Sequence, residues 1–305
     1  MIVPVIQQST YYTVFGTPVA GALFGVEVLA IGQLQYAVLF PSFVAGIVGY
    51  QVSTALGTTY FHHPINFVPT FSELFFFKVV LGGVAFGLFS FLFIELLKLT
   101  ERFSDRLHWW LPLKGLVGGV LLLFTLVVGD RYLGLGLPTI ESTLNGTSIA
   151  TSFDPFVKMA ATAVTLSFGG SGGIVTPIFF IGATAGSCLA TAFGLDPATG
   201  AALGIVGTLA GCANTPISAS VMAIELFGAT LSPYAAVTCI VSFLMVGHRS
   251  VYPSQILAIA KSSSLRPDVG KAVEDTNGVT LVSREESVIG LGKKLVRRFR
   301  KKPKR

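Results

Sequence analysis

The chain has 305 residues, of which 52% are hydrophobic and only 12% charged, with a mean hydropathy of +0.73 and a formal net charge of +6. Soluble domains carry about 25% charged residues, so this composition excludes an ordinary soluble protein and predicts an integral membrane protein. The three cysteines lie in apolar stretches without C-x-x-C spacing, so neither a disulfide framework nor a metal site is indicated.

Apolar segments follow one another along the chain, at 12–31, 36–57, 72–99, 113–129, 156–168, 176–194, 199–212, 215–231 and 232–247. A helix needs about 20 residues to cross the hydrocarbon core. Segments such as 156–168 and 199–212 are too short, so they predict half-spanning, tilted or re-entrant helices whose ends lie inside the membrane. The expected fold is therefore an all-α integral membrane bundle.

An internal repeat links the two ends of this bundle. Residues Phe15–Glu27 and Ala213–Glu225 share Thr-Pro and a final Glu at the same spacing, 198 residues apart. Duplicated halves around a central site are common in membrane transport proteins. Glu27 and Glu225 are functional candidates as ionisable groups in a membrane. Their recurrence in both copies nevertheless favours a structural role, in which they accept hydrogen bonds from a neighbouring backbone or loop.

A glycine-rich loop precedes one of the predicted helices. The stretch Gly169-Gly-Ser-Gly-Gly-Ile-Val-Thr-Pro177 ends in Thr-Pro, a pair typical of a helix start. Four glycines allow the backbone amides of Ile174 and Val175 to approach a ligand, and a helix N-terminus favours an anion. The stretch also contains G-x-S-x-G, so an intramembrane serine hydrolase is an alternative. That enzyme needs a strand before the serine and a base, for which His248 is the candidate.

Charge separates the chain into a membrane domain and a tail. Residues 1–260 hold 8 Lys/Arg and 10 Asp/Glu, whereas residues 261–305 hold 13 and 5. Basic segments next to membrane spans stay in the cytoplasm. We therefore expect a multi-pass domain at 1–260 in the cell membrane and a cytoplasmic tail at 261–305. The tail suits either an amphipathic helix on anionic lipid or a solvated, disordered segment, and no nucleic-acid partner is expected.

Two of these motifs carry a family resemblance. Gly173-Ile-Val-Thr-Pro177 resembles the GxFxP anion-site motif of the CLC chloride channel and transporter family, and His248–Ile256 resembles the start of that family's last helix. The resemblance implies a CLC-like bundle with an inverted repeat, a homodimer, and chloride as the bound and transported ion without any cofactor. It places the anion at Gly173, at the amides of Ile174 and Val175, and at the hydroxyl of Tyr252.

Departures from the family pattern refine the expected function. Val28 stands where proton-coupled relatives have a second glutamate, which favours passive, channel-like conduction over proton coupling. The early GSGxP and GKEGP motifs are absent from the sequence, so we expect a fold truncated at the N-terminus and little selective flux from this chain by itself. The main hypothesis is a CLC-type anion channel or transporter, not an enzyme. The alternative is a non-conducting, truncated subunit or remnant.

Overall fold

A computed structural model describes residues 15–58, 63–65, 72–147, 150–261, 265–266, 269–275 and 280–281. Their α-helices are α2 (Pro18–Glu27), α3 (Leu39–Ala55), α4 (Glu73–Arg106), α5 (Leu111–Val128), α6 (Leu137–Leu144), α7 (Asp154–Ser167), α8 (Val175–Ala192), α9 (Pro197–Ala213), α10 (Pro216–Phe227) and α11 (Ser232–Val246). The strands are β1 (Ala30–Ile31), β2 (Ile256–Leu257), β3 (Leu265–Arg266) and β4 (Thr280–Leu281). The described chain is thus predominantly helical, as predicted.

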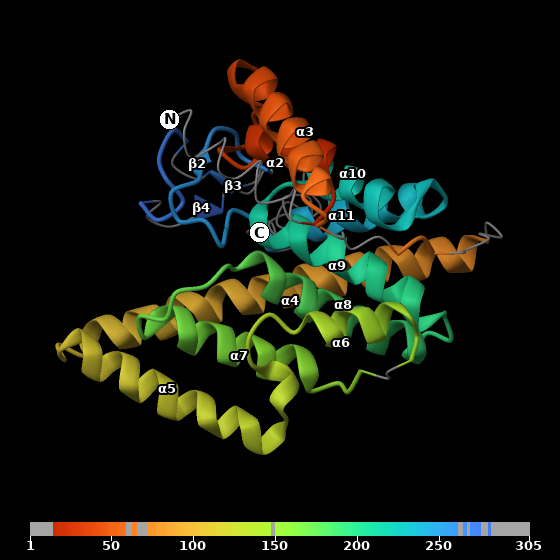
Figure 1. The fold of residues 1–305 in the computed structure, drawn as a ribbon. Helices are drawn as coiled ribbons and strands as arrows, with labels where there is room; N and C mark the ends of the chain where they lie inside the picture. Colours follow the sequence, from red (N-terminus) through yellow and green to blue (C-terminus); the bar gives the residue numbers. More distant parts are fainter. Residues whose placement is uncertain are drawn as a thin grey trace, which may run out of the picture.

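Helices of two lengths build the bundle. Those long and apolar enough to cross a membrane are Tyr36–Ala55, Glu73–Arg106, Leu111–Val128, Val175–Ala192 and Ala229–Val246. Shorter apolar helices are α2, α9 and α10. In Figure 1, α3 projects from one end of the molecule and α5 lies along its outer edge. Both carry many exposed aliphatic side chains, which is the surface expected of helices that face lipid.

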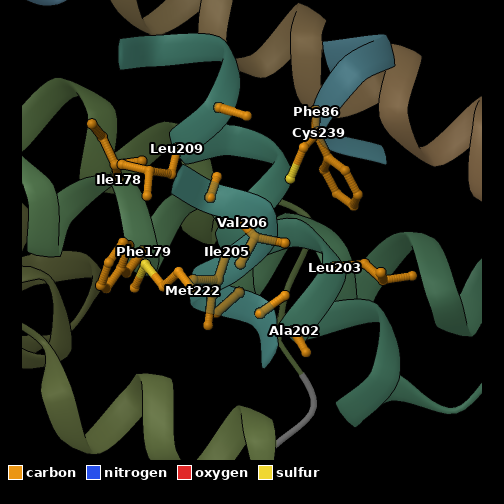
Figure 2. Packing of buried hydrophobic residues seen from close by; sticks show 14 of the residues in the cluster. Phe86, Ile178, Phe179, Ala202, Leu203, Ile205, Val206, Leu209, Met222 and Cys239 are labelled. Carbon is orange, nitrogen blue, oxygen red and sulfur yellow. The ribbon is translucent and has the colours of Figure 1, made fainter. Parts of the chain in front are cut away.

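The centre of the bundle is α9, whose side chains from Thr199 to Ala213 are all buried. It packs on α8 through glycines. A Cβ atom added at Gly186 would lie 2.0 Å from the carbonyl oxygen of Gly200, so the two backbones are in direct contact. Figure 2 shows α9 residues such as Val206 and Leu209 among side chains from α4, α8, α10 and α11. A mid-sized helix without a polar face is therefore held by close packing on every side.

The two copies of the sequence repeat form an antiparallel pair, α2 and α10. The carboxylate of Glu27, at the end of α2, accepts hydrogen bonds from the N–H groups of Ile217 (3.0 Å) and Ser218 (2.8 Å) at the start of α10. Glu225 in turn accepts from the N–H groups of the two residues that follow Pro18, at 3.0 and 2.8 Å. Each repeat thus caps the other, which confirms both the inverted arrangement and the structural role predicted for the two glutamates.

The segment after α11 differs from the expectation. The sequence resemblance placed the start of a last helix at His248–Ile256, but the described residues from 248 to 261 contain no helix. Instead, β2 pairs in parallel with β1, with Ile256 opposite Ala30 and Leu257 opposite Ile31. The N–H of Ile256 donates to the carbonyl of Leu29 (3.1 Å). In a helix this N–H would bond within its own segment, whereas here it is bound by the residues that follow α2. Most of the tail, including 288–305, lies outside the described residues.

Candidate functional site

The glycine loop is shaped by its first two glycines. Gly169 has φ +90°, a conformation that L side chains rarely adopt, and a Cβ atom at Gly170 would lie 2.6 Å from the carbonyl oxygen of Thr165. A Cβ atom at Gly172 or Gly173 would meet nothing within 4 Å. A Cβ atom at Gly173 would therefore not obstruct the loop. The tight turn needs the first two glycines, whereas the last two leave open space in front of α8.

The N-terminus of α8 has free amide groups. Ile174 is its N-cap residue, and no side chain caps the helix. In the part of the chain that the structure describes, the N–H groups of Ile174, Val175 and Thr176 donate to no acceptor. Pro177, the next residue, has no N–H. These unpaired donors, together with the positive end of the helix dipole, are the groups that bind anions at helix N-termini.

Three other helix N-termini of the bundle already hold a carboxylate. Glu225 occupies that of α2 and Glu27 that of α10, while Asp196 accepts from the N–H of Thr199 (2.8 Å) at the start of α9. The fold therefore pairs short apolar helices with a protein anion at their positive ends. The start of α8 differs because its amides are left for an acceptor from outside the described chain.

A cavity of about 280 Å³ adjoins the glycine loop. Its lining includes Ser171, Gly172 and Gly173 from the loop, Lys158 from α7, and Tyr132 from the turn before α6. Polar atoms thus face a cavity whose other walls are leucine, alanine and threonine side chains. The combination of an apolar wall and a few convergent polar groups is typical of a small-ligand site.

Lys158 is the charged group of this cavity. It is only 2% exposed, and its Nζ donates to the carbonyl oxygens of Tyr132 (3.0 Å) and Gly134 (2.6 Å). Among the described residues it forms no ion pair, and the carboxylate of Asp154 in the same helix is bound by Arg131 (2.8 Å). Burying an unneutralised ammonium group is costly, and an anion that enters the cavity would compensate the charge of Lys158.

Sequence reasoning missed Lys158. The available signal was a lone cation inside the apolar segment 156–168, which is unusual in a membrane helix. The pattern did not show which face of the helix the lysine occupies. Its position next to the glycine loop depends on how α7 packs against α8, and only the tertiary structure gives that.

The four predicted anion residues do not all line the same cavity. Gly173 lines the cavity with Lys158, whereas Ile174, Val175 and Tyr252 are partly buried and pack against the main hydrophobic core. Tyr252 lies beside α2, with its ring 6.2 Å from that of Phe24. Its hydroxyl forms no hydrogen bond with the described residues, so the phenol is available to a ligand.

The hydrolase alternative lacks its structural requirements. Ser171 follows α7, a helix, and not the strand that a nucleophile elbow needs. The Nε2 of His248 accepts from the backbone N–H of Lys261 at 3.0 Å, so that nitrogen is already engaged. The G-x-S-x-G match is therefore a consequence of the glycine loop.

The short buried helices, the mutually capped repeat and the amide-lined helix start are features typical of membrane transport proteins with helix ends inside the bilayer. Comparison with known families agrees, because the model of the voltage gated chloride channel family matches residues 13–247. The chain belongs to this family, the CLC family, which comprises channels and transporters and not enzymes. The match ends before Tyr252.

Individual relatives support the assignment. The chain is 40% identical over 266 residues to the chloride/fluoride channel protein of Pseudomonas syringae pv. tomato, covering 85% of this chain and 58% of the relative. It is 29% identical over 245 residues to the voltage-gated ClC-type chloride channel ClcB of Shigella flexneri, covering 75% and 57%. The chain thus spans about three-fifths of the length of these relatives.

Solved structures show the same fold. The crystal structure of a CLC-type fluoride/proton antiporter matches with a TM-score of 0.76 and 30% identity, over 79% of this chain and 61% of the other. That of a eukaryotic CLC transporter matches with a TM-score of 0.58 and 18% identity, over 76% and 41%. The predicted CLC-like membrane bundle is confirmed.

Proposed function

We propose that this chain forms part of the pathway for a monovalent halide, fluoride or chloride, in a multi-pass membrane protein. The observation that carries the proposal is the start of α8, where the N–H groups of Ile174 and Val175 are unpaired behind the open positions at Gly172 and Gly173. In the proposed site these amides and the hydroxyl of Tyr252 donate hydrogen bonds to the anion. Lys158 supplies the positive charge of the adjoining cavity.

The choice of anion rests on chemistry and on relatives. Backbone amides and a phenol select for a compact negative charge, which both halides offer. The sequence suggested chloride, but the names of the Pseudomonas syringae relative and of the antiporter structure include fluoride. We propose that both halides bind and that fluoride is the preferred one. We further propose passive movement, because Val28 has no group that carries a proton.

Assembly and orientation are part of the proposal. We propose a homodimer in the cell membrane, with a membrane domain at 1–260 and a basic tail at 261–305 in the cytoplasm next to anionic lipid. The charge imbalance of the tail supports this orientation. Light scattering of the purified protein measures the first property, and protease access to the tail in oriented vesicles measures the second.

Equilibrium binding tests the site directly. The purified 305-residue chain in detergent is titrated calorimetrically with sodium fluoride and sodium chloride, with sodium gluconate as the control. We expect halide binding that weakens about fivefold in Tyr252→Phe, because one hydrogen bond worth about 1 kcal/mol is lost while the amides remain. Absence of binding by either halide would refute the proposal, and unchanged affinity in Tyr252→Phe would remove Tyr252 from the site.

Flux tests the transport step. The chain is reconstituted in liposomes loaded with fluoride or chloride, and efflux is followed with an ion-selective electrode alongside a pH-sensitive dye. Because the early GSGxP and GKEGP motifs are absent from the sequence, we expect little selective efflux from this chain by itself, and no proton movement with any halide that passes. Coupled proton movement would contradict passive transport, and binding without efflux would favour a non-conducting subunit.

A further inference from the structure

The bend that carries Tyr252 is held without a helix. It lies between the end of α11 at Val246 and the start of β2 at Ile256. One backbone bond ties its middle to α9, from the N–H of Val251 to the carbonyl of Cys212 at 3.0 Å. Within the bend, the N–H of Tyr252 donates to Oγ of Ser250 (3.0 Å) and the N–H of Gln255 donates to the carbonyl of Tyr252 (3.1 Å). A chain segment with so few internal hydrogen bonds needs other contacts to fix the direction of its side chains.

Asn214 connects the two sides of this bend. Its Nδ2 donates to the carbonyl of Arg249 (2.8 Å) and to Oε1 of Gln255 (3.1 Å), which lie three residues before and three residues after Tyr252. Asn214 ends α9 with φ 59°, and among the described residues it is the only one other than glycine with a positive φ. This conformation turns its side chain away from the helix that precedes it and toward the bend.

Gln255 and Lys261 extend the same network. The Nε2 of Gln255 donates to the carbonyls of Val28 (2.8 Å) and Ala213 (3.0 Å), where α2 and α9 end. The Nζ of Lys261 donates to Oδ1 of Asn214 and to the carbonyl of Phe243 (2.7 Å). We call Asn214, Gln255 and Lys261 the polar clamp.

Asn214 and Gln255 of the polar clamp are fully satisfied and buried, and Lys261 is partly exposed. Asn214 and Gln255 are each 2% exposed, and both amide groups use two donors and one acceptor. Displacing either side chain leaves several buried polar groups without partners, each at a cost of about 1–3 kcal/mol. A buried network with every partner in place therefore specifies one geometry.

We propose that the polar clamp positions Tyr252. Residues 248–261 contain no helix that would fix the direction of its side chain, and Asn214 and Gln255 perform this role instead. They act through Tyr252 and do not touch the anion. The proposal rests on the proposed function, because it assigns the orientation of a phenol that donates to a halide. It also predicts that the end of the first repeat, at Val28, contributes to the geometry of a site formed by the second repeat.

Two variants remove the clamp without changing the backbone. Asn214→Gly keeps the left-handed conformation, which glycine adopts freely, and removes all three side-chain hydrogen bonds. Gln255→Met keeps the chain length of the side chain and removes its polar atoms, and it carries the same tests if Asn214→Gly fails to fold. Thr143→Ala is the control, because it deletes a buried hydroxyl bonded to the carbonyl of Thr139 in α6, outside the bend.

The first measurement reads Tyr252 without any anion. 3-Fluorotyrosine is incorporated at position 252, and its fluorine NMR signal is recorded in detergent without halide. We expect one narrow resonance in the parent and in Thr143→Ala, and a split or broadened resonance in Asn214→Gly and Gln255→Met. An unchanged resonance in both clamp variants would overturn the proposal.

The second measurement is a double-mutant cycle on halide affinity. We expect Asn214→Gly to weaken fluoride binding about fivefold in the parent and less than twofold in the Tyr252→Phe background, because the clamp acts only through the phenol. Equal losses in the two backgrounds would show a merely structural role and overturn the proposal. If Tyr252→Phe alone leaves affinity unchanged, the proposed anion role of Tyr252 fails, and the fluorine resonance still decides whether the clamp positions it.

Discussion

Replacing the two repeat glutamates should reduce stability by unequal amounts. In Glu27→Ala, the N–H groups of Ile217 and Ser218 and the hydroxyl of Ser218 lose their acceptor, at 3.0, 2.8 and 2.6 Å in the parent. Glu27 is 7% exposed, so water replaces it poorly. With about 1 kcal/mol or more for each unsatisfied buried donor, we expect a loss of about 3 kcal/mol.

Glu225→Ala should cost less, about 1 kcal/mol. Its carboxylate accepts from two N–H groups, and the bond from the N–H of Val19 is exposed, whereas the bonds from Ile217 and Ser218 to Glu27 are partly or fully buried. This value is that of an ordinary helix cap. The difference between the two variants follows from burial and from the third hydrogen bond, which the hydroxyl of Ser218 donates to Glu27 and which Ala20, at the equivalent position of the other repeat, cannot donate.

The free energy of unfolding is measured by titrating the purified protein from dodecyl maltoside into SDS and following its circular dichroism. Glu101→Ala, at an exposed position near the end of α4, is the control and should leave the midpoint unchanged. The reasoning is refuted if Glu27→Ala unfolds like the parent, or if Glu225→Ala is the more damaging of the two. Loss of halide binding at unchanged stability would instead identify these glutamates as functional groups.

Three further predictions concern the loop, the cavity and the tail. Gly170→Ala should lower the free energy of unfolding by about 1–3 kcal/mol because its Cβ atom overlaps a carbonyl oxygen, whereas Gly173→Ala should stay within about 0.5 kcal/mol of the parent; equal effects in SDS titration would contradict this. Lys158→Met should weaken fluoride binding about tenfold in calorimetry through loss of a desolvated charge. The control is Lys78→Met, which removes a lysine bonded to the carbonyl of Phe193, outside this cavity. Parent-like fluoride binding by Lys158→Met would exclude the cavity from the pathway. Lys261 lies beyond the last span, and burial lowers its pKa to about 7. The unfolded chain keeps that proton up to about pH 10. Since the unfolded state then binds more protons than the folded state, the free energy of unfolding should rise between pH 7 and pH 10. Lys261→Met should remove this rise, and an identical pH dependence in both proteins would show that Lys261 is not the titrating group.

The sequence by itself determined the class of protein and the local structures. Low charge and long apolar segments require a bilayer, and short segments between them require helix ends inside it. The Thr-Pro-to-Glu repeat specified two equivalent helices, and the glycine loop before Thr176-Pro177 specified an exposed helix start. These are local properties, because helix caps, glycine conformations and hydropathy depend on residues close together in the chain.

The tertiary structure decided which of these elements meet. That Glu27 caps α10 and not its own helix, and that Lys158 faces the glycine loop, depends on packing between segments far apart in sequence. The same holds for the segment after α11. Its residues suggested a helix, but Val28, β1 and Asn214 offer its backbone and side chains hydrogen-bond partners at the end of α2, just after it, and at the end of α9. Because hydrogen bonds between distant segments are satisfied only in the folded chain, no local pattern could have shown that Tyr252 lies in a clamped bend.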